Sequence, residues 1–335
     1  MDVFLEIADN YVFDSLYGKV VNAFPASPAS PVMEASSMNT TTAIINNSIS
    51  NSSTIASAFL DRNNLFRQGL SLFFITWIMG TLSYFVSACI AYFFYFDRQE
   101  ARQHPKFLKN QELLELKVAL SNLPGMAVLT FPWFLAELRG YSYAYDDPAE
   151  YGYFYLGFSV ILFLLFSDFL IYWIHRGLHH PWFYGPLHKL HHKWIIPTPF
   201  SSHAFHFLDG YSQSLPYHLF PFFFPLNKYL YLVLFGSVNY WTVLIHDGKY
   251  FSNNAVINGA AHHASHHMYF NYNYGQFFTL FDRLCSSYRH PDQELFDAEL
   301  KKDKKLQKQR VGEMEYMLKN VEGTDDRMYT DKKNA

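Results

Sequence analysis

Clustered histidines constrain this chain more than any other feature of its sequence. The chain has sixteen histidines, and fourteen of them lie between His175 and His267. They include an HxxxH pair that begins at His175 and two HxxHH clusters, one ending at His192 and one at His267. On a helix, spacings of three and four residues place side chains on one face. The pattern is typical of a metal site made almost wholly of imidazole, built from separate segments of the chain.

Local signals predict that both HxxHH clusters are helical. Counting the pair at His175 as the first cluster, Gly185-Pro186 precedes the second cluster, which ends at His192, with a proline suited to the first turn of a helix, and Pro197 lies beyond its end. Asn258-Gly259 is a suitable cap before the third cluster, which ends at His267. Three imidazoles of each cluster are therefore expected on one helical face.

Nine histidines are predicted metal ligands and four others are possible ligands. The nine are His175, His179, His188, His191, His192, His246, His263, His266 and His267. The possible ones are His180, His203, His206 and His262, whereas His104, His218 and His290 are interpreted as structural. So many ligands exceed what one metal ion can use, and they fit two.

The type of ligand restricts the choice of metal but does not identify a single metal. Imidazole suits zinc, copper, iron and nickel alike. A zinc ion needs only three or four ligands, the two cysteines Cys89 and Cys285 do not form a cysteine-based site, and no HExxH motif is present. Two iron ions held by neutral imidazoles would keep positions open for oxygen, a site able to attack an unactivated C–H bond. Carboxylates are expected to orient the rings, and the candidates are Asp168, Asp209 and Asp247.

Composition and apolar blocks predict an all-α integral membrane protein. Half of the residues are hydrophobic and 16% are charged, against about 25% in a typical soluble domain. The net charge of −3 argues against nucleic acid as a partner. Three blocks predict crossings, the second broken or kinked by its prolines: residues 70–96, 116–138 and 155–173. The fold class is a multi-span helical bundle with a cytosolic, histidine-rich helical cap that holds a di-metal site.

The last apolar region, residues 214–245, predicts a helical hairpin, either two tight spans or a re-entrant pair. Both options return the chain to its starting side, so His246 emerges beside the other histidines. Basic residues in the 97–110 loop place that loop in the cytosol. The histidines and the C-terminus are then cytosolic, and the N-terminus is lumenal.

Both ends of the chain differ in composition from its centre. Residues 1–60 are interpreted as a flexible lumenal tail with glycosylation sequons at Asn39, Asn46 and Asn51. Residues 296–335 are interpreted as a basic cytosolic tail, whose helix is either simply solvated or attracted to anionic lipid or an acidic protein. The pair Lys332-Lys333 matches a retrieval signal of the endoplasmic reticulum.

Several motifs together resemble the sterol C5-desaturases of the fatty acid hydroxylase superfamily. They are HRGLHH, HKLHH, HHASHH, KWIIPTPFSSHAFHFLDG, QSLPYHLFPFFFPLNK, IHDG and FNYNYGQFFTLFDR. The resemblance covers residues 70–295 and implies a membrane catalytic domain there, with histidine boxes at 175–179, 188–192 and 263–267. It implies a di-iron enzyme of the endoplasmic reticulum membrane that puts a C5–C6 double bond into a Δ7-sterol. The resemblance also implies O2 as oxidant and electrons from NAD(P)H, passed through cytochrome b5 reductase and cytochrome b5.

Two other functions are compatible with the histidines. A sterol 4-methyl oxidase or fatty acid 2-hydroxylase would keep the iron and insert oxygen, and product analysis separates it from a desaturase. A histidine-rich zinc transporter or metal-regulated receptor would not be an enzyme at all. Transporter ligands are expected near the bilayer midplane, whereas these clusters lie at the ends of apolar blocks.

Overall fold

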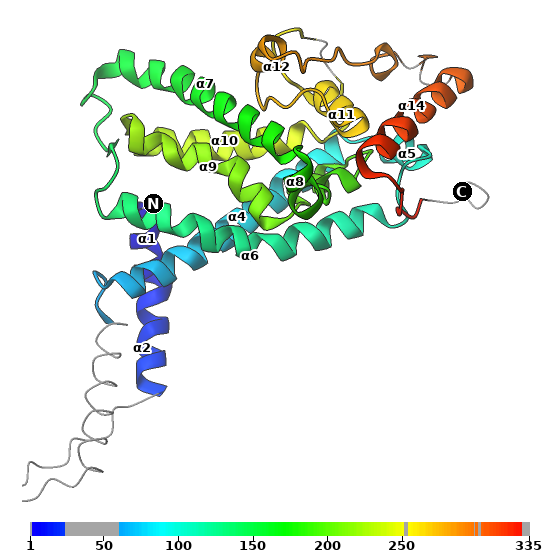
Figure 1. The fold of residues 1–335 in the computed structure, drawn as a ribbon. Coiled ribbons are helices and arrows are strands. Elements are labelled where there is room, and N and C mark those ends of the chain that lie inside the picture. The colour runs from blue at the N-terminus through cyan, green and yellow to red at the C-terminus, as the bar shows by residue number, and fades with distance from the viewer. Residues whose placement is uncertain (1, 24–59, 251–253, 298, 301–302, 330–335) are drawn as a thin grey trace, which may run out of the picture. The chain divides into compact units, whose positions relative to one another are not determined.

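The structure is a computed structural model that describes residues 2–23, 60–250, 254–297, 299–300 and 303–329. Its regular structure is almost wholly helical, as predicted (Figure 1). It divides into two compact units: residues 1–76 with 130–139, and residues 77–129 with 140–335. The sequons at Asn39, Asn46 and Asn51, the pair Lys332-Lys333 and two tail lysines, Lys301 and Lys302, lie outside the described residues.

The first unit begins with helices rather than with a flexible tail. The short helices α1 (Asp2–Ala8), η1 (Asp9–Phe13) and α2 (Asp14–Ala23) follow one another without a break. The Arg67 guanidinium bonds to the Asp9 carboxylate at 2.9 Å with both side chains buried, and the hydroxyls of Tyr17 and Ser71 are 2.8 Å apart. A flexible tail is therefore the wrong description of residues 2–23, because buried contacts hold them to the start of the first span.

Three of the described helices are long and apolar enough to cross a membrane: α4 (Leu65–Phe94), α6 (Gln111–Leu138) and α7 (Gly152–Leu178). At 1.5 Å per residue, each exceeds the ~30 Å hydrocarbon thickness of a bilayer. Large apolar side chains such as Phe93 and Phe154 are exposed on them, as lipid contact requires. Helix α6 runs through Pro124 and Pro132, so of the two predicted alternatives the break is wrong, and a kink stays a prediction. Each proline lacks the N–H of one helical hydrogen bond, while neighbouring bonds can remain.

The predicted hairpin is present as α9 (Phe207–Phe223) and α10 (Lys228–Leu244). Asn227 does not interrupt it but caps α10, because its side chain accepts the N–H groups of Tyr229 and Leu230 at 3.1 and 3.2 Å. Figure 1 shows α9 and α10 beside α7, and α7 and α9 are in contact.

The turn of the hairpin lies beside the first turn of α7. Strand β2 (Leu226–Asn227) pairs in parallel with β1 (Ala144–Tyr145), which precedes α7. The Tyr155 hydroxyl donates to the Pro225 carbonyl at 2.9 Å. The hairpin therefore runs beside α7, and its two ends lie near the histidines at the other end of that helix. Each of its helices has 17 residues, or about 25 Å at 1.5 Å per residue, so neither of the two predicted options is selected by length.

The histidine clusters adopt two different conformations. The third cluster lies on α11 (Ala260–Tyr269), whose N-cap is Gly259. The second cluster is not one α-helix: η2 (Tyr184–His188) is a π-helix closed by Lys189 N–H to Tyr184 C=O at 2.7 Å, and η3 (His191–Lys193) is a 3₁₀ turn. A π turn inserts one residue more than an α turn, so the predicted common face does not form there.

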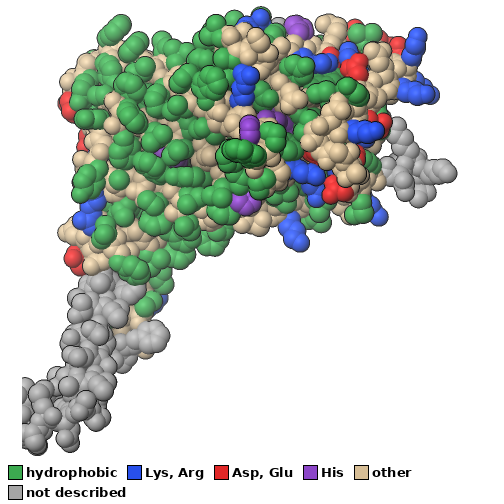
Figure 2. Space-filling model, viewed as in Figure 1, with side chains coloured by type: hydrophobic (Ala, Val, Ile, Leu, Met, Phe, Trp, Pro, Cys, Tyr) green, Lys and Arg blue, Asp and Glu red, His purple; other side chains and the backbone are tan. Residues whose placement is uncertain are grey.

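The remaining described elements pack around these clusters or connect them. They are α5 (Arg98–Gln103), α8 (Pro181–Phe183), η4 (Pro199–His203), α12 (Leu280–Leu284), η5 (Gln293–Leu295) and α14 (Lys304–Glu322). Met314 and Leu318 of α14 are buried in the same cluster as Met268 and Phe270. The predicted helix of the basic tail therefore forms, but it packs on the histidine-bearing segment instead of standing free. In Figure 2, hydrophobic side chains cover the α7 side and charged ones gather around α14.

Candidate metal centre

The ends of several helices deliver the predicted ligands to one place. His175 lies in the last turn of α7 and His179 caps that helix. His246 follows the C-terminal end of α10, and α11 carries three further ligands. The imidazole centroids of His175 and His266 are 4.5 Å apart, and those of His191 and His267 are 4.7 Å apart. Segments separated by about seventy residues or more thus meet at the end of α7.

The nine predicted ligands form two groups able to hold a metal ion. Within each group, one nitrogen of every imidazole lies within 4.8 Å of the others. The first group is His175, His179, His188, His192 and His266, and the second is His191, His246, His263 and His267. We expected the three imidazoles of each HxxHH cluster to share one helical face and so one metal ion, and this is wrong. The neighbours His191 and His192 belong to different groups, as do His266 and His267.

In the first group, hydrogen-bond acceptors outside the group fix the tautomers of three imidazoles. The Nδ1 atoms of His175 and His266 lie 2.9 and 2.7 Å from the carbonyl oxygens of Tyr274 and Tyr272. The Nδ1 atom of His188 lies 2.8 Å from the Asp209 carboxylate. Carbonyls and carboxylates only accept, so Nδ1 carries a proton in each ring, and Nε2 is the nitrogen that faces the group.

In the second group, the carbonyl of Thr242 on α10 plays the same part for His246. Its oxygen lies 2.7 Å from His246 Nδ1, so the Nε2 lone pair faces the group. That Nε2 atom is 2.9 Å from His263 Nε2, which is in turn 3.1 Å from His267 Nε2. Each ring therefore presents a nitrogen to its neighbours at close range.

These contacts fit a cation shared between the rings. The Nε2 atoms of His175 and His188 are 3.2 Å apart, and with both rings protonated at Nδ1 their lone pairs face each other. Two ligands at a right angle about a metal, with bonds of about 2.1 Å, would be separated by about 3.0 Å, which matches the observed contacts. The Nε2 atom of His266 is buried without any hydrogen-bond partner. Metal ions therefore fit this donor set, and ligation by these nine histidines stays a prediction.

Burial keeps the imidazoles in the neutral form that metal binding needs. Removal from water lowers the pKa of His246 to about 4. Burial, reinforced by the neighbouring imidazoles, lowers the pKa well below the usual range for His179, His191, His192, His263, His266 and His267. Protons therefore compete poorly for these nitrogens at neutral pH.

The metal-free protein is expected to lose stability as the pH falls from 7 to 5. Below about pH 6.5, histidines of the unfolded chain bind protons while the buried ones do not, so each adds up to ~1.4 kcal/mol of destabilisation per pH unit. The penalty is absent above pH 6.5 and stops growing only below the folded pKa, about 4 for His246. Thermal unfolding in detergent with a chelator measures it. A melting temperature that rises on acidification would contradict the expectation.

The four possible ligands lie outside both groups. His180 and His206 act as helix N-caps, accepting the N–H groups of Trp182 and Leu208. His203 is buried beside Ser202, with its Nδ1 atom 3.1 Å from the serine hydroxyl. His262 has its Nε2 atom 3.4 Å from the Tyr288 hydroxyl. The residues interpreted as structural, His104, His218 and His290, are also outside the groups.

The three predicted carboxylates differ in what they contact. Asp209 binds His188, and both side chains are fully buried. One oxygen of Asp168 accepts backbone N–H groups of residues 276–278 and the carboxylate bonds to no imidazole. Asp247 accepts the N–H of Lys249 at 2.7 Å. Of the three candidates, Asp209 alone orients an imidazole directly, because α9 brings it beside the second cluster.

Sequence reasoning missed the backbone acceptors and one carboxylate, Asp282. No residue type identifies a carbonyl that will face an imidazole, so the roles of Tyr272, Tyr274 and Thr242 had no sequence signal. Asp282 follows the NYNYGQFF stretch, and it is buried with both oxygens bonded to that stretch. An acidic residue inside the quoted motif FNYNYGQFFTLFDR was the available hint.

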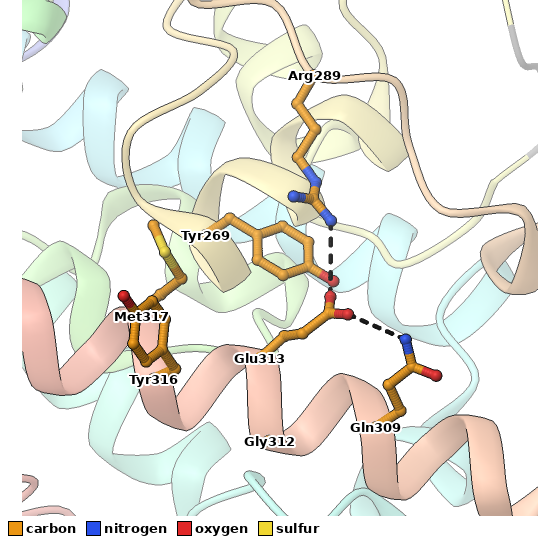
Figure 3. A pocket seen from close by; sticks show the side chains of 7 residues that line it. All are labelled: Tyr269, Arg289, Gln309, Gly312, Glu313, Tyr316 and Met317. Atoms are coloured by element: carbon orange, nitrogen blue, oxygen red, sulfur yellow. Dashed lines mark hydrogen bonds and ion pairs between the residues drawn. The ribbon is translucent and has the colours of Figure 1, made fainter.

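A surface pocket of about 420 Å³ lies away from the histidine groups. Tyr269 and Arg289 face Gln309, Glu313 and other residues of α14 across it (Figure 3). Arg289 and Glu313 are already paired there at 3.8 Å, and no residue of either histidine group lines the pocket. The pocket is therefore a feature of the α11–α14 packing and not part of the metal centre.

Comparisons with known proteins agree with this site. The family described as Fatty acid hydroxylase matches residues 160–287, which include all nine histidines. The chain is 71% identical to the Delta(7)-sterol 5(6)-desaturase erg32 of Schizosaccharomyces pombe over 334 residues, covering the whole of both chains. It is 51% identical to erg31 of the same yeast over 98% of this chain and 97% of that one. No solved structure matches the chain.

A third relative also matches over nearly its full length. The chain is 50% identical to the probable Delta(7)-sterol 5(6)-desaturase of Neurospora crassa, over 98% of this chain and 97% of the relative. Because such identity extends over the spans and the histidines alike, the chain belongs to the family of the Delta(7)-sterol 5(6)-desaturases, which are membrane-bound oxidoreductases.

Proposed function

We propose that this protein is a sterol C5-desaturase that forms a C5–C6 double bond in a Δ7-sterol. One observation carries the proposal: two groups of buried imidazoles present their lone pairs to shared sites, in a chain similar to desaturases over its full length. The double bond forms by loss of one hydrogen from C5 and one from C6. Together with two electrons and two protons, these hydrogens reduce one O2 to two molecules of water.

Iron is the metal proposed for both groups, where it would supply the activation of O2 that an unactivated C–H bond demands. The residues of the chain hold that centre and tune it. Asp209 and the carbonyls of Tyr272, Tyr274 and Thr242 keep four rings oriented with Nε2 inward. Burial of eight of the nine histidines, with His179 partly exposed, limits access of bulk water and favours the neutral rings.

The electrons are proposed to come from NAD(P)H through cytochrome b5 reductase and cytochrome b5. An acidic donor protein would be attracted to a basic surface near the centre. Exposed lysines at the start of α14, Lys304, Lys305 and Lys308, provide positive charge on the helix that packs against α11. Because α14 packs against α11 and is not a free tail, these lysines favour an acidic partner protein over the binding of anionic lipid.

The endoplasmic reticulum membrane is the proposed location, with the histidines and the C-terminus in the cytosol. The basic residues that follow α4, including Arg98 and Arg102, support this orientation by the excess of positive charge in cytosolic loops.

Expression of the full chain in yeast that lacks its own sterol C5-desaturase tests the proposal. Mass spectrometry of the sterols is expected to show conversion of Δ7-sterols into Δ5,7-sterols, which cells with an empty vector do not make. An oxygenated sterol in place of the diene would identify a hydroxylase with the same metal centre. Unchanged Δ7-sterols in cells that contain the folded protein would refute the desaturase.

A further inference from the structure

The segment between α11 and α12 supplies two of the carbonyls that orient the first histidine group. The carbonyl of Tyr272 faces His266 Nδ1 at 2.7 Å, and that of Tyr274 faces His175 Nδ1 at 2.9 Å. Residues 271–274 have no regular secondary structure, so helix or sheet hydrogen bonds do not fix these carbonyls. Other contacts of the segment must hold them in place.

Two buried carboxylates bind five successive N–H groups of this segment. Asp282, on α12, accepts the N–H groups of Tyr274 and Gly275, one on each oxygen, both at 2.9 Å. One oxygen of Asp168, on α7, accepts the next three N–H groups, those of residues 276–278, at 3.0, 2.7 and 3.4 Å. The exposed fraction of the aspartate is 0% at position 168 and 1% at position 282. Burial shields both acids from solvent, and Asp282 Oδ1 accepts the Ser287 hydroxyl at 2.8 Å in addition.

A single peptide group links Asp282 to His175. The N–H of Gly275 and the C=O of Tyr274 belong to the same peptide bond, and they bond to Asp282 and to His175 respectively. A carboxylate that accepts from a peptide N–H polarises the peptide and makes its carbonyl a stronger acceptor. A stronger acceptor at Nδ1 raises the basicity of Nε2, the nitrogen that faces the first group.

Gly275 is the residue that permits this arrangement. A Cβ atom at this position would lie 2.4 Å from the carbonyl oxygen of Phe278 and 3.1 Å from Asp282 Oδ2. The backbone oxygen cannot move aside without shifting the segment that Asp168 holds. The close approach of Asp282 to the Tyr274–Gly275 peptide therefore needs a glycine.

We propose that Asp282 and Asp168 are positioning residues of the first histidine group and act on it through the backbone of residues 274–278. Asp282 acts on His175 through one peptide bond, and Asp168 fixes the segment beyond it. The proposal rests on the proposed metal centre. It adds that these two residues act on the first histidine group and not on the second. Both carbonyls serve the first group, whereas His246 of the second group is held by Thr242 of α10.

Asn substitutions in the full-length protein test this selectivity. In Asp282→Asn, the amide N–H₂ would oppose one of two backbone N–H groups. In Asp168→Asn, the single accepting oxygen is retained, so a smaller effect is expected. Asp292→Asn is the matched control, because Asp292 bonds to Tyr269 and to arginines without touching the 274–278 backbone.

The measurements are metal content per chain, competition with a chelator, and the absorption spectrum with Co²⁺ in place of the native metal. Asp282→Asn is expected to weaken one of two bound ions about tenfold, the lower end of the range for outer partners of metal ligands, and to change its spectrum. The second ion bound by Asp282→Asn should keep its wild-type affinity and spectrum. The control Asp292→Asn should have the melting temperature of the wild type.

Three outcomes overturn the positioning role or the centre itself. Wild-type affinity and spectrum for both ions in Asp282→Asn would show that Asp282 does not act on His175. Equal weakening of both ions would show a general structural role. Wild-type protein that binds no metal while it still desaturates sterols would refute the metal centre, and metal-bound wild type that leaves sterols unchanged would refute the proposed function alone.

Discussion

Replacing His266 with alanine is expected to abolish desaturation, with a loss of more than about 100-fold. His266 is fully buried in the first group, and its Nε2 atom has no partner inside the protein. Loss of an outer partner of a metal ligand typically costs 10–100-fold in metal affinity or activity, and loss of the ligand itself should cost more. Sterol conversion and metal content of the purified variant measure the effect.

His262→Ala is the matched control for that variant. Both histidines lie on α11 and both are buried, but His262 contacts the Tyr288 hydroxyl and belongs to neither group. It should retain both metal ions and most of the activity, even if some stability is lost. Equal loss of metal in the two variants would mean that helix packing, rather than ligation, explains the effect at His266.

The histidine pattern predicted which residues gather, because ligand chemistry restricts the possible residues so strongly. Each of the nine predicted ligands lies in one of the two groups, and the four uncertain ones lie outside both. Helical periodicity could not predict how the nine divide. His191 and His192 are consecutive and enter different groups, which follows from the π-helix at 184–188 and the 3₁₀ turn after it.

The acidic residues show a second limit of sequence reasoning. Asp168 was a candidate because an ionisable group inside a span is usually functional. In the structure Asp168 is buried and contacts no imidazole. It accepts backbone N–H groups of a segment about 110 residues later in the chain. Contacts at such sequence separation depend on how the spans pack, and no local pattern encodes them.

The hairpin does more than return the chain to the histidines. Helix α9 carries Asp209, which holds His188 of the first group, and α10 supplies the Thr242 carbonyl that holds His246 of the second. The two helices therefore contribute one fixed imidazole contact to each group. A change in the packing of the hairpin against α7 would therefore alter the orientation of an imidazole in both groups.

Replacing Asp209 with alanine is expected to lower metal affinity and desaturation 10- to 100-fold. The variant leaves the buried His188 Nδ1 without its acceptor, so the ring can rotate or change tautomer and direct the wrong nitrogen at the first group. Asp209→Asn should lose less, because an amide oxygen can still accept from Nδ1. Metal titration of the purified variants and sterol analysis measure these effects. Asp247→Asn is the control, since Asp247 is also buried and adjoins a ligand but contacts no imidazole. If Asp247→Asn lost as much metal as Asp209→Ala, the contact between Asp209 and His188 would not be what orients the first group.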